Sequence, residues 1–161
     1  MSADSIVCGY FLVRSTNEYA MAQEKIMRLP KGLPAKLYMC QEIFHKTPSY
    51  LSQAGYMIPI AFSGKSIALP DTLGEYLDMW EEFISDLQGE ELFLCIDQEF
   101  GWSSREHFCK QYYQWVMTSY ESKDPAKWVF MGNLPEYDGN WKSKFTMDLE
   151  ENWVCTNPAH Q

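Results

Sequence analysis

Residues 71–102 read DTLGEYLDMWEEFISDLQGEELFLCIDQEFGW, and this stretch decides the fold. Its first half repeats apolar residues at the spacing of one continuous helical face. Asp71 is a suitable N-cap and Gly89 a suitable stop, so the spacing predicts a helix over 71–88. The apolar run 92–96 is too short for a helix and predicts a central strand covered on both faces. The apolar helical positions are Leu73, Tyr76, Leu77, Trp80, Phe83, Ile84 and Leu87.

The same stretch carries the negative charge of the protein. The chain has 22 acidic and 13 basic residues and a formal net charge of −9. Ten of the acids lie within 71–99, and no Lys or Arg occurs between Lys65 and Arg105. We therefore expect a negative surface beside the helix that steers cationic partners. The ten acids are Asp71, Glu75, Asp78, Glu81, Glu82, Asp86, Glu90, Glu91, Asp97 and Glu99.

Length and composition indicate one globular domain over residues 1–161. Apolar residues make up 46% of the chain and aromatic residues 16%, which excludes a disordered protein. The five cysteines are an odd number without close pairs, and the N-terminus lacks a secretory pattern, so we expect a reduced cytoplasmic location. No apolar run reaches the length of a membrane span.

The rest of the chain alternates between helix and strand signals. A second main helix is predicted over 103–121, because Ser103 and Glu106 form a capping-box pattern before a periodic apolar run. A thinner helix is predicted over 16–29, with Thr16 or Asn17 as its cap. The segment 36–46 fits a strand or a short helix, and the strand is favoured.

Further strands are predicted at the remaining apolar runs. Gly9 marks a bulge or a close approach of another chain segment, and Pro59 places its strand at an edge or bulge. A D-G pair at 138–139 predicts a hairpin turn before an alternating, half-exposed strand. A helical turn is predicted at 48–53 and a polar turn at 63–65. The predicted strands are 6–13, 56–62, 127–131 and 141–150.

Together these elements predict an α+β fold. The sheet is expected to be mixed or mainly antiparallel, with about five to six strands. Two main amphipathic helices, 71–88 and 103–121, are expected to pack on it.

Motifs for cofactor or metal chemistry are absent from the sequence. Gly64-Lys65-Ser66 resembles the end of a phosphate-binding loop, but Pro59 occupies the position of its first glycine. His107 and Cys109 lack the second pair that a zinc site needs. No cofactor and no metal are therefore expected.

One interpretation is a small hydrolase or metal-binding enzyme with a carboxylate and cysteine site. Cys95, Asp97 and Glu99 follow one another along a predicted central strand, and His107 could serve as the base. The simpler reading treats Cys95 as a core thiol and the two acids as a solvated strand end.

The other interpretation is a protein-binding module. Direct nucleic-acid binding is disfavoured, because the basic residues are dispersed and a negative chain is repelled by phosphates. A rigid row of carboxylates instead suits a basic partner protein, such as a toxin or a nucleic-acid-binding protein, whose site it would mask. Immunity proteins and phage-encoded inhibitors share this size and acidity, although no motif identifies a family.

The predicted partner surface combines the acids with apolar anchors. Trp80 is a further candidate anchor. The acids could equally be the solvated outer face of an amphipathic helix, and the protein could be a monomer or a homodimer. The predicted contact residues are Glu75, Asp78, Met79, Glu82, Asp86, Glu90, Glu91, Asp97, Glu99 and Trp102.

Overall fold

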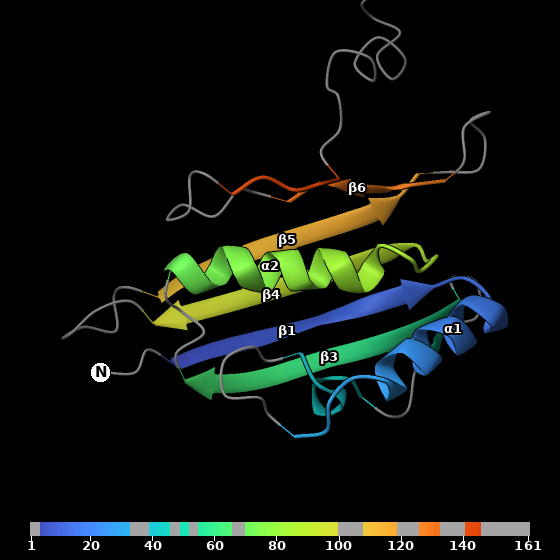
Figure 1. Cartoon of the computed structure of the whole chain (residues 1–161), viewed down its shortest axis with the longest axis horizontal. Coiled ribbons are helices and arrows are strands. Elements are labelled where there is room, and N and C mark those ends of the chain that lie inside the picture. The colour runs from blue at the N-terminus through green and yellow to red at the C-terminus, as the bar shows by residue number, and fades with distance from the viewer. Residues whose placement is uncertain are drawn as a thin grey trace, which may run out of the picture.

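The computed structural model describes residues 4–32, 39–45, 49–51, 55–65, 70–99, 108–118, 126–132 and 141–145. These residues form six strands, two α-helices and one short 3₁₀ helix (Figure 1). The strands are β1 (Asp4–Val13), β2 (Ser49–Leu51), β3 (Gly55–Lys65), β4 (Glu91–Glu99), β5 (Phe108–Met117) and β6 (Trp128–Phe130). The helices are α1 (Thr16–Met27), η1 (Gln41–Ile43) and α2 (Pro70–Ile84).

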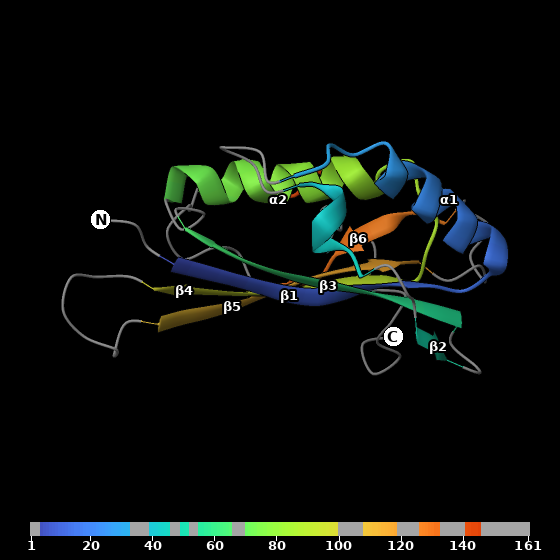
Figure 2. The same ribbon diagram turned by 90° about the horizontal axis from the view of Figure 1, so that it is seen from below.

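The strands form one antiparallel sheet in the order β2-β3-β1-β4-β5-β6. Figure 2 shows α1, η1 and α2 together on one face of this sheet. The predicted α+β class is therefore confirmed. No described helix lies on the opposite face, so within the described residues helices cover β4 on one side only, where a cover above and below was expected.

The core lies between the sheet and the helices because alternate side chains of each strand point toward the helical layer. The inner stripe of α2 packs onto them, as its spacing predicted. Trp80, at the centre of this stripe, is fully buried. The strand residues buried on this side are Val7, Phe11, Val13, Ile58, Ile60, Leu92, Leu94, Ile96, Tyr113, Trp115 and Met117.

The two central strands, β1 and β4, approach each other unusually closely at Gly9. A Cβ atom at this position would lie 1.9 Å from the carbonyl oxygen of Phe93. Only glycine leaves room for that oxygen, so the predicted close approach at Gly9 is confirmed.

The N-cap of the first helix lies earlier in the chain than predicted. Ser15, rather than Thr16 or Asn17, is the N-cap residue, and its hydroxyl accepts from the backbone N–H of Glu18 at 3.1 Å. The carboxylate of Glu18 accepts in turn from the N–H of Arg14 at 2.7 Å. This reciprocal pair resembles a capping box and fixes the turn between β1 and α1.

The second helix ends earlier than residue 88. α2 stops at Ile84, and the Ser85 hydroxyl donates to the carbonyl of Glu82 at 2.8 Å. The chain then turns so that Leu87 still enters the core, while its carbonyl accepts from the indole N–H of Trp128 at 2.9 Å. Gly89 therefore lies in the connection to β4, not at the helix end.

The predicted helix over 103–121 is wrong, because Phe108–Met117 is strand β5. Its inward residues Tyr113, Trp115 and Met117 alternate with Gln114 and Val116, as in any strand. Pairing with β4 over nine positions outweighs the helical periodicity. Ser103 and Glu106, the proposed cap, lie outside the described residues.

Smaller elements also depart from the predictions. Within 36–46 the described part forms η1 and a single bridge from Phe44 to Ile60, not a strand. The predicted helical turn at 48–53 contains strand β2, and the predicted polar turn at 63–65 continues β3. Residues 141–145 form no strand, and the predicted turn at 138–139 lies outside the described residues.

The remaining strand predictions are confirmed. β1, β3, β4 and β6 coincide with the apolar runs that predicted them. Pro59 lies in β3 beyond the three residues that pair with β2, so this part of β3 is an edge, and its carbonyl accepts from the N–H of His45 at 2.8 Å. No helix among the described residues is long and apolar enough to cross a membrane.

Candidate functional site

The outer face of α2 is an exposed stripe of carboxylates. Glu75, Asp78 and Glu82 recur on α2 at three- and four-residue spacing, Asp86 continues this spacing just after the helix ends, and all four side chains are exposed. They lie opposite the buried stripe that holds α2 on the sheet. The sequence predicted this arrangement from helical periodicity alone. We call these four residues the acidic stripe.

The C-terminal half of the acidic stripe is partly neutralised by lysines from other parts of the chain. Lys25 of α1 forms an ion pair with Asp86 and donates to the carbonyl of Glu82 at 3.3 Å. Lys144 forms an ion pair with Glu82 at 3.1 Å. The negative potential is therefore weaker here than the sequence around 71–99 suggests, since that stretch contains no Lys or Arg and the two lysines come from distant segments.

The N-terminal half keeps its charge. Asp78 accepts from the indole N–H of Trp141 at 2.8 Å, and this donor brings no positive charge to the acidic stripe. Among the described residues, the ion pairs involve Glu24, Glu82, Asp86 and Glu90, and none involves Glu75 or Asp78. The negative electrostatic potential on the outer face of α2 is therefore concentrated around Glu75 and Asp78.

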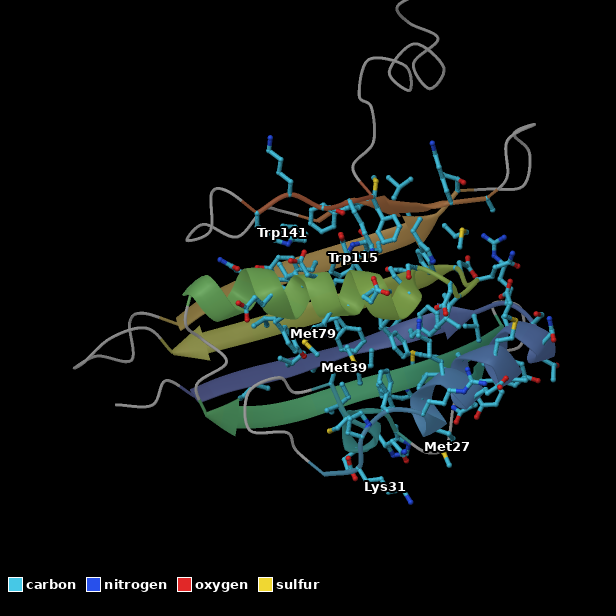
Figure 3. The ribbon with its side chains drawn as sticks, viewed as in Figure 1. Met27, Lys31, Met39, Met79, Trp115 and Trp141 are labelled. Atoms are coloured by element: carbon cyan, nitrogen blue, oxygen red, sulfur yellow. The ribbon has the colours of Figure 1, made fainter. Side chains whose placement is uncertain are left out.

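Glu81 is part of the acidic sequence but not of the acidic stripe. Its side chain is only 1% exposed and accepts from the Trp115 indole at 2.9 Å, the Lys144 backbone N–H at 3.0 Å and the Ser143 hydroxyl. These bonds tie the segment 141–145 and strand β5 to α2. Figure 3 shows Trp115 and Trp141 on this side of the helix. The role of Glu81 is structural.

Glu90 and Glu91 do not extend the acidic stripe. Glu90 lies in the turn before β4, and its carboxylate is 3.7 Å from the guanidinium of Arg14. Glu91 accepts from the Tyr10 hydroxyl at 2.9 Å and from the Gln114 amide at 2.8 Å. Its neighbours belong to the sheet face opposite the helices. The predicted single surface is therefore divided between two faces.

The Tyr10–Glu91 pair gives the protein a pH-dependent contribution to stability. Burial, with the hydrogen bond to Glu91, raises the pKa of Tyr10 from 10.0 to about 12. Between these values the folded state holds the proton more tightly than the unfolded state, so stability is present below pH 10 and falls toward pH 12. In urea unfolding at pH 8 to 12, we expect a steeper loss for the wild type than for Tyr10→Phe. If the unfolding free energies of wild type and Tyr10→Phe fell equally over this pH range, the raised pKa of Tyr10 would be contradicted.

The other predicted contact residues are less accessible or lie elsewhere. Met79 is half-buried and packs against the core on the flank of α2 that faces Met39 (Figure 3). Trp80 is fully buried and cannot anchor a partner. Asp97 and Glu99 occupy the last positions of β4, in register with Lys110 and Phe108. Trp102 lies outside the described residues.

The sheet topology does not support the predicted enzyme site at the end of β4. Sites cluster at the carboxyl ends of strands in open parallel sheets, whereas β4 is antiparallel to both of its neighbours. Cys95 is buried in the sheet, in register with Cys8 of β1 and Tyr112 of β5. His107 lies outside the described residues. The described part of the chain does not assemble this constellation.

A metal or a small ligand would need a cluster of donor side chains or a cavity. In the described segments no three His, Cys, Asp or Glu side chains gather to hold a metal. A cavity of about 550 Å³ lies between α1 and the segment 39–45, and Glu42 on its rim accepts from the N–H of Gly32 at 2.9 Å, which lowers the pKa of Glu42. Its lining mixes apolar, amide and charged side chains. The lining residues are Gln23, Ile26, Met27, Lys31, Gln41, Glu42, Phe44 and His45.

Comparison with known proteins gives no relative. The chain matches no protein-family model, no curated protein and no solved structure. Function must therefore be argued from the molecule itself.

Proposed function

We propose that the protein is a binding module that docks a basic partner protein on the acidic stripe of α2, in a reducing cytoplasm. The observation that carries this proposal is the exposed pair Glu75 and Asp78 on the outer face of α2, which forms no ion pair within the described part of the chain. A toxin or a nucleic-acid-binding protein presents the complementary surface, because its site is built to hold phosphates. The protein masks that site.

Rigidity supports this role. The acidic stripe stands on a helix whose opposite stripe is buried, and Trp80 and Leu77 on that stripe are fully enclosed. The Trp141 indole also fixes the Asp78 carboxylate. Carboxylates held in one geometry lose little side-chain entropy when they meet a cationic groove, so affinity and association rate both benefit.

The lysines beside the acidic stripe shape its specificity. Lys25 and Lys144 neutralise its C-terminal half, so a partner whose cations meet the N-terminal half is favoured over one that needs all four carboxylates. A partner that placed its cations against the C-terminal half would be repelled by Lys25 and Lys144. This predicts that the contact is centred near Glu75.

Charge reversal at exposed positions tests the proposal. Glu75→Lys/Glu82→Lys changes the acidic stripe but leaves the Asp78–Trp141 bond in place. Glu24→Lys/Glu42→Lys is the matched control, because it makes the same change in net charge at exposed positions on α1 and η1. Tagged wild type, variant and control are used to capture proteins from source-cell lysate at low and high salt, and circular dichroism checks their folding.

We expect wild type and control to retain the same basic protein in stoichiometric amount at low salt. The Glu75→Lys/Glu82→Lys variant should bind the purified partner at least about tenfold more weakly, and high salt should weaken the wild type. Retention that ignores the reversal, or that fails equally in the control, would show that the acidic stripe is only a solvated helix face.

A further inference from the structure

The sheet face opposite the helices is apolar over its centre. Alternate residues of four adjacent strands point to this side, in register across the sheet. Ile6 is 54% exposed and Tyr112 48% exposed, and most of the others are half-buried. We call it the open face. Its described members are Ile6, Cys8, Tyr10, Leu12, Met57, Pro59, Ala61, Glu91, Phe93, Cys95, Tyr112, Gln114 and Val116.

A row of aromatic rings crosses the open face. The rings of Tyr10 and Phe93 stack with centroids 5.5 Å apart and planes at 23°, and Tyr112 continues the row at 6.0 Å from Phe93. Stacked neighbours turn their ring faces toward one another. The row therefore offers ring edges and ridges rather than a flat platform for a nucleic-acid base. Such relief suits interdigitation with the side chains of another sheet.

The centre of the open face is almost free of charge. Between the Ile6–Tyr112 end and the Leu12–Val116 end Glu91 is the only acid among the described residues, and there is no Lys or Arg. Beyond Tyr112 and beside Ile6, at one end of the face, Asp97 of β4 and Lys110 of β5 lie in register with each other, one acid beside one base. The Glu91 carboxylate is already engaged by Tyr10 and Gln114. The acidic stripe lies in the helical layer on the other side of the sheet (Figure 2). Two copies that meet through their open faces would therefore keep their acidic stripes apart, on the two outer surfaces.

We propose that the open face is the interface of a homodimer, in which the sheets of two copies pack face to face. A surface whose centre is neutral and apolar is complementary to itself, whereas a highly charged partner would find little counter-charge there. A face-to-face contact through these side chains would lie near the lower limit for a specific interface, roughly 1,000 Å² in total. Contacts of this small size are typical of weak association that depends on protein concentration.

The homodimer is independent of the proposed function, and salt separates the two. Screening the net charge of −9 reduces repulsion between copies, so the dimer should hold or tighten at high salt. The acidic stripe should bind its partner less tightly under the same conditions. Failure of either proposal therefore leaves the other standing.

Sedimentation velocity over about 1 to 200 µM, at 0.05 and 0.5 M NaCl, tests the proposal. The variant Ile6→Glu/Tyr112→Glu places charges at two exposed positions of the open face. Met21→Glu/Met27→Glu is the matched control, because these α1 side chains are 43% and 64% exposed and lie outside the open face. We expect wild type and control to dimerise in the same concentration range and the open-face variant to remain monomeric.

Labelling of Cys8 gives a second readout on the protein itself. Cys8 is exposed in the single chain and lies within the open face, whereas Cys40 is buried in the core. Alkylation of the peptide that contains Cys8, followed by mass spectrometry, should slow as the protein concentration rises. In Ile6→Glu/Tyr112→Glu the rate should be independent of concentration.

Three results would overturn the homodimer. The first is a wild type that stays monomeric at 200 µM with Cys8 fully reactive, which would leave the open face to some other occupant. The second is a dimer that persists in Ile6→Glu/Tyr112→Glu, which would place the contact elsewhere, for example on the edge of β3. The third is equal dissociation of the Met21→Glu/Met27→Glu control.

Discussion

Gly9→Ala should abolish the cooperative native fold. The added Cβ would lie 1.9 Å from the carbonyl oxygen of Phe93 and 2.9 Å from its carbonyl carbon. Both are backbone atoms of β4, so relief requires β1 and β4 to separate at the centre of the sheet. We expect a loss of more than about 4 kcal/mol, a large part of the stability of a domain this size. Circular dichroism during urea unfolding measures it.

Gly32→Ala is the control for that substitution. Gly32 has a φ of +83°, so alanine is strained there too, but nothing lies within 4 Å of its added Cβ. The backbone term alone should lower stability by about 1 kcal/mol. A Gly9 variant as mild as the Gly32 variant would disprove the close approach of β1 and β4.

The elements that the sequence predicted well share one property: their local pattern agrees with their tertiary environment. In α2 the apolar stripe is buried and the acids are exposed. In β1 an apolar run contains a single glycine where another strand passes closely. When local pattern and packing agree, spacing alone is enough to find an element.

β5 shows where spacing fails. Its inward side carries Tyr113, Trp115 and Met117, but Tyr112 and Val116 on the open face are apolar as well. Apolar residues on both faces hide the period of two and imitate a helical stripe. The tyrosines, tryptophan and valine favour a strand, and that preference was the usable signal. The S-x-x-E pattern does not separate a helix from a strand here: it caps α1 at Ser15 and Glu18, and it also occurs at 103–106, ahead of strand β5.

The candidate site was predictable in composition but not in geometry. The run of acids and the outer face of α2 follow from residues near one another in the chain. The lysines that neutralise part of this charge could not be predicted in the same way. Lys25 and Lys144 come from segments about 60 residues away on either side. Long-range pairing also turned Glu91 toward Tyr10 and away from the acidic stripe. Local sequence does not contain these contacts.

Glu81→Ala should destabilise the protein by about 3 to 5 kcal/mol, although Glu81 looks like one more acid of a charged run. The substitution removes the acceptor of three donors: the Trp115 indole, the Ser143 hydroxyl and the Lys144 backbone N–H. Each buried donor left unsatisfied costs about 1 to 3 kcal/mol. The segment 141–145 should also loosen, because two of these donors belong to it. Urea unfolding gives the free energy, and hydrogen exchange at Lys144 reports on the loosening.

Glu82→Ala is the matched control, one residue further along the same helix. The Glu82 side chain is 80% exposed and pairs with Lys144 at 3.1 Å, so its loss should change stability by less than about 1 kcal/mol. The two variants remove the same charge and give alanine the same helix propensity, so their difference isolates burial and hydrogen bonding. Equal effects would mean that the Glu81 carboxylate faces solvent. A large effect for Glu81 alone would show that one of the ten acids serves the fold, which leaves the exposed stripe beside it as the part of the acidic run free to serve recognition.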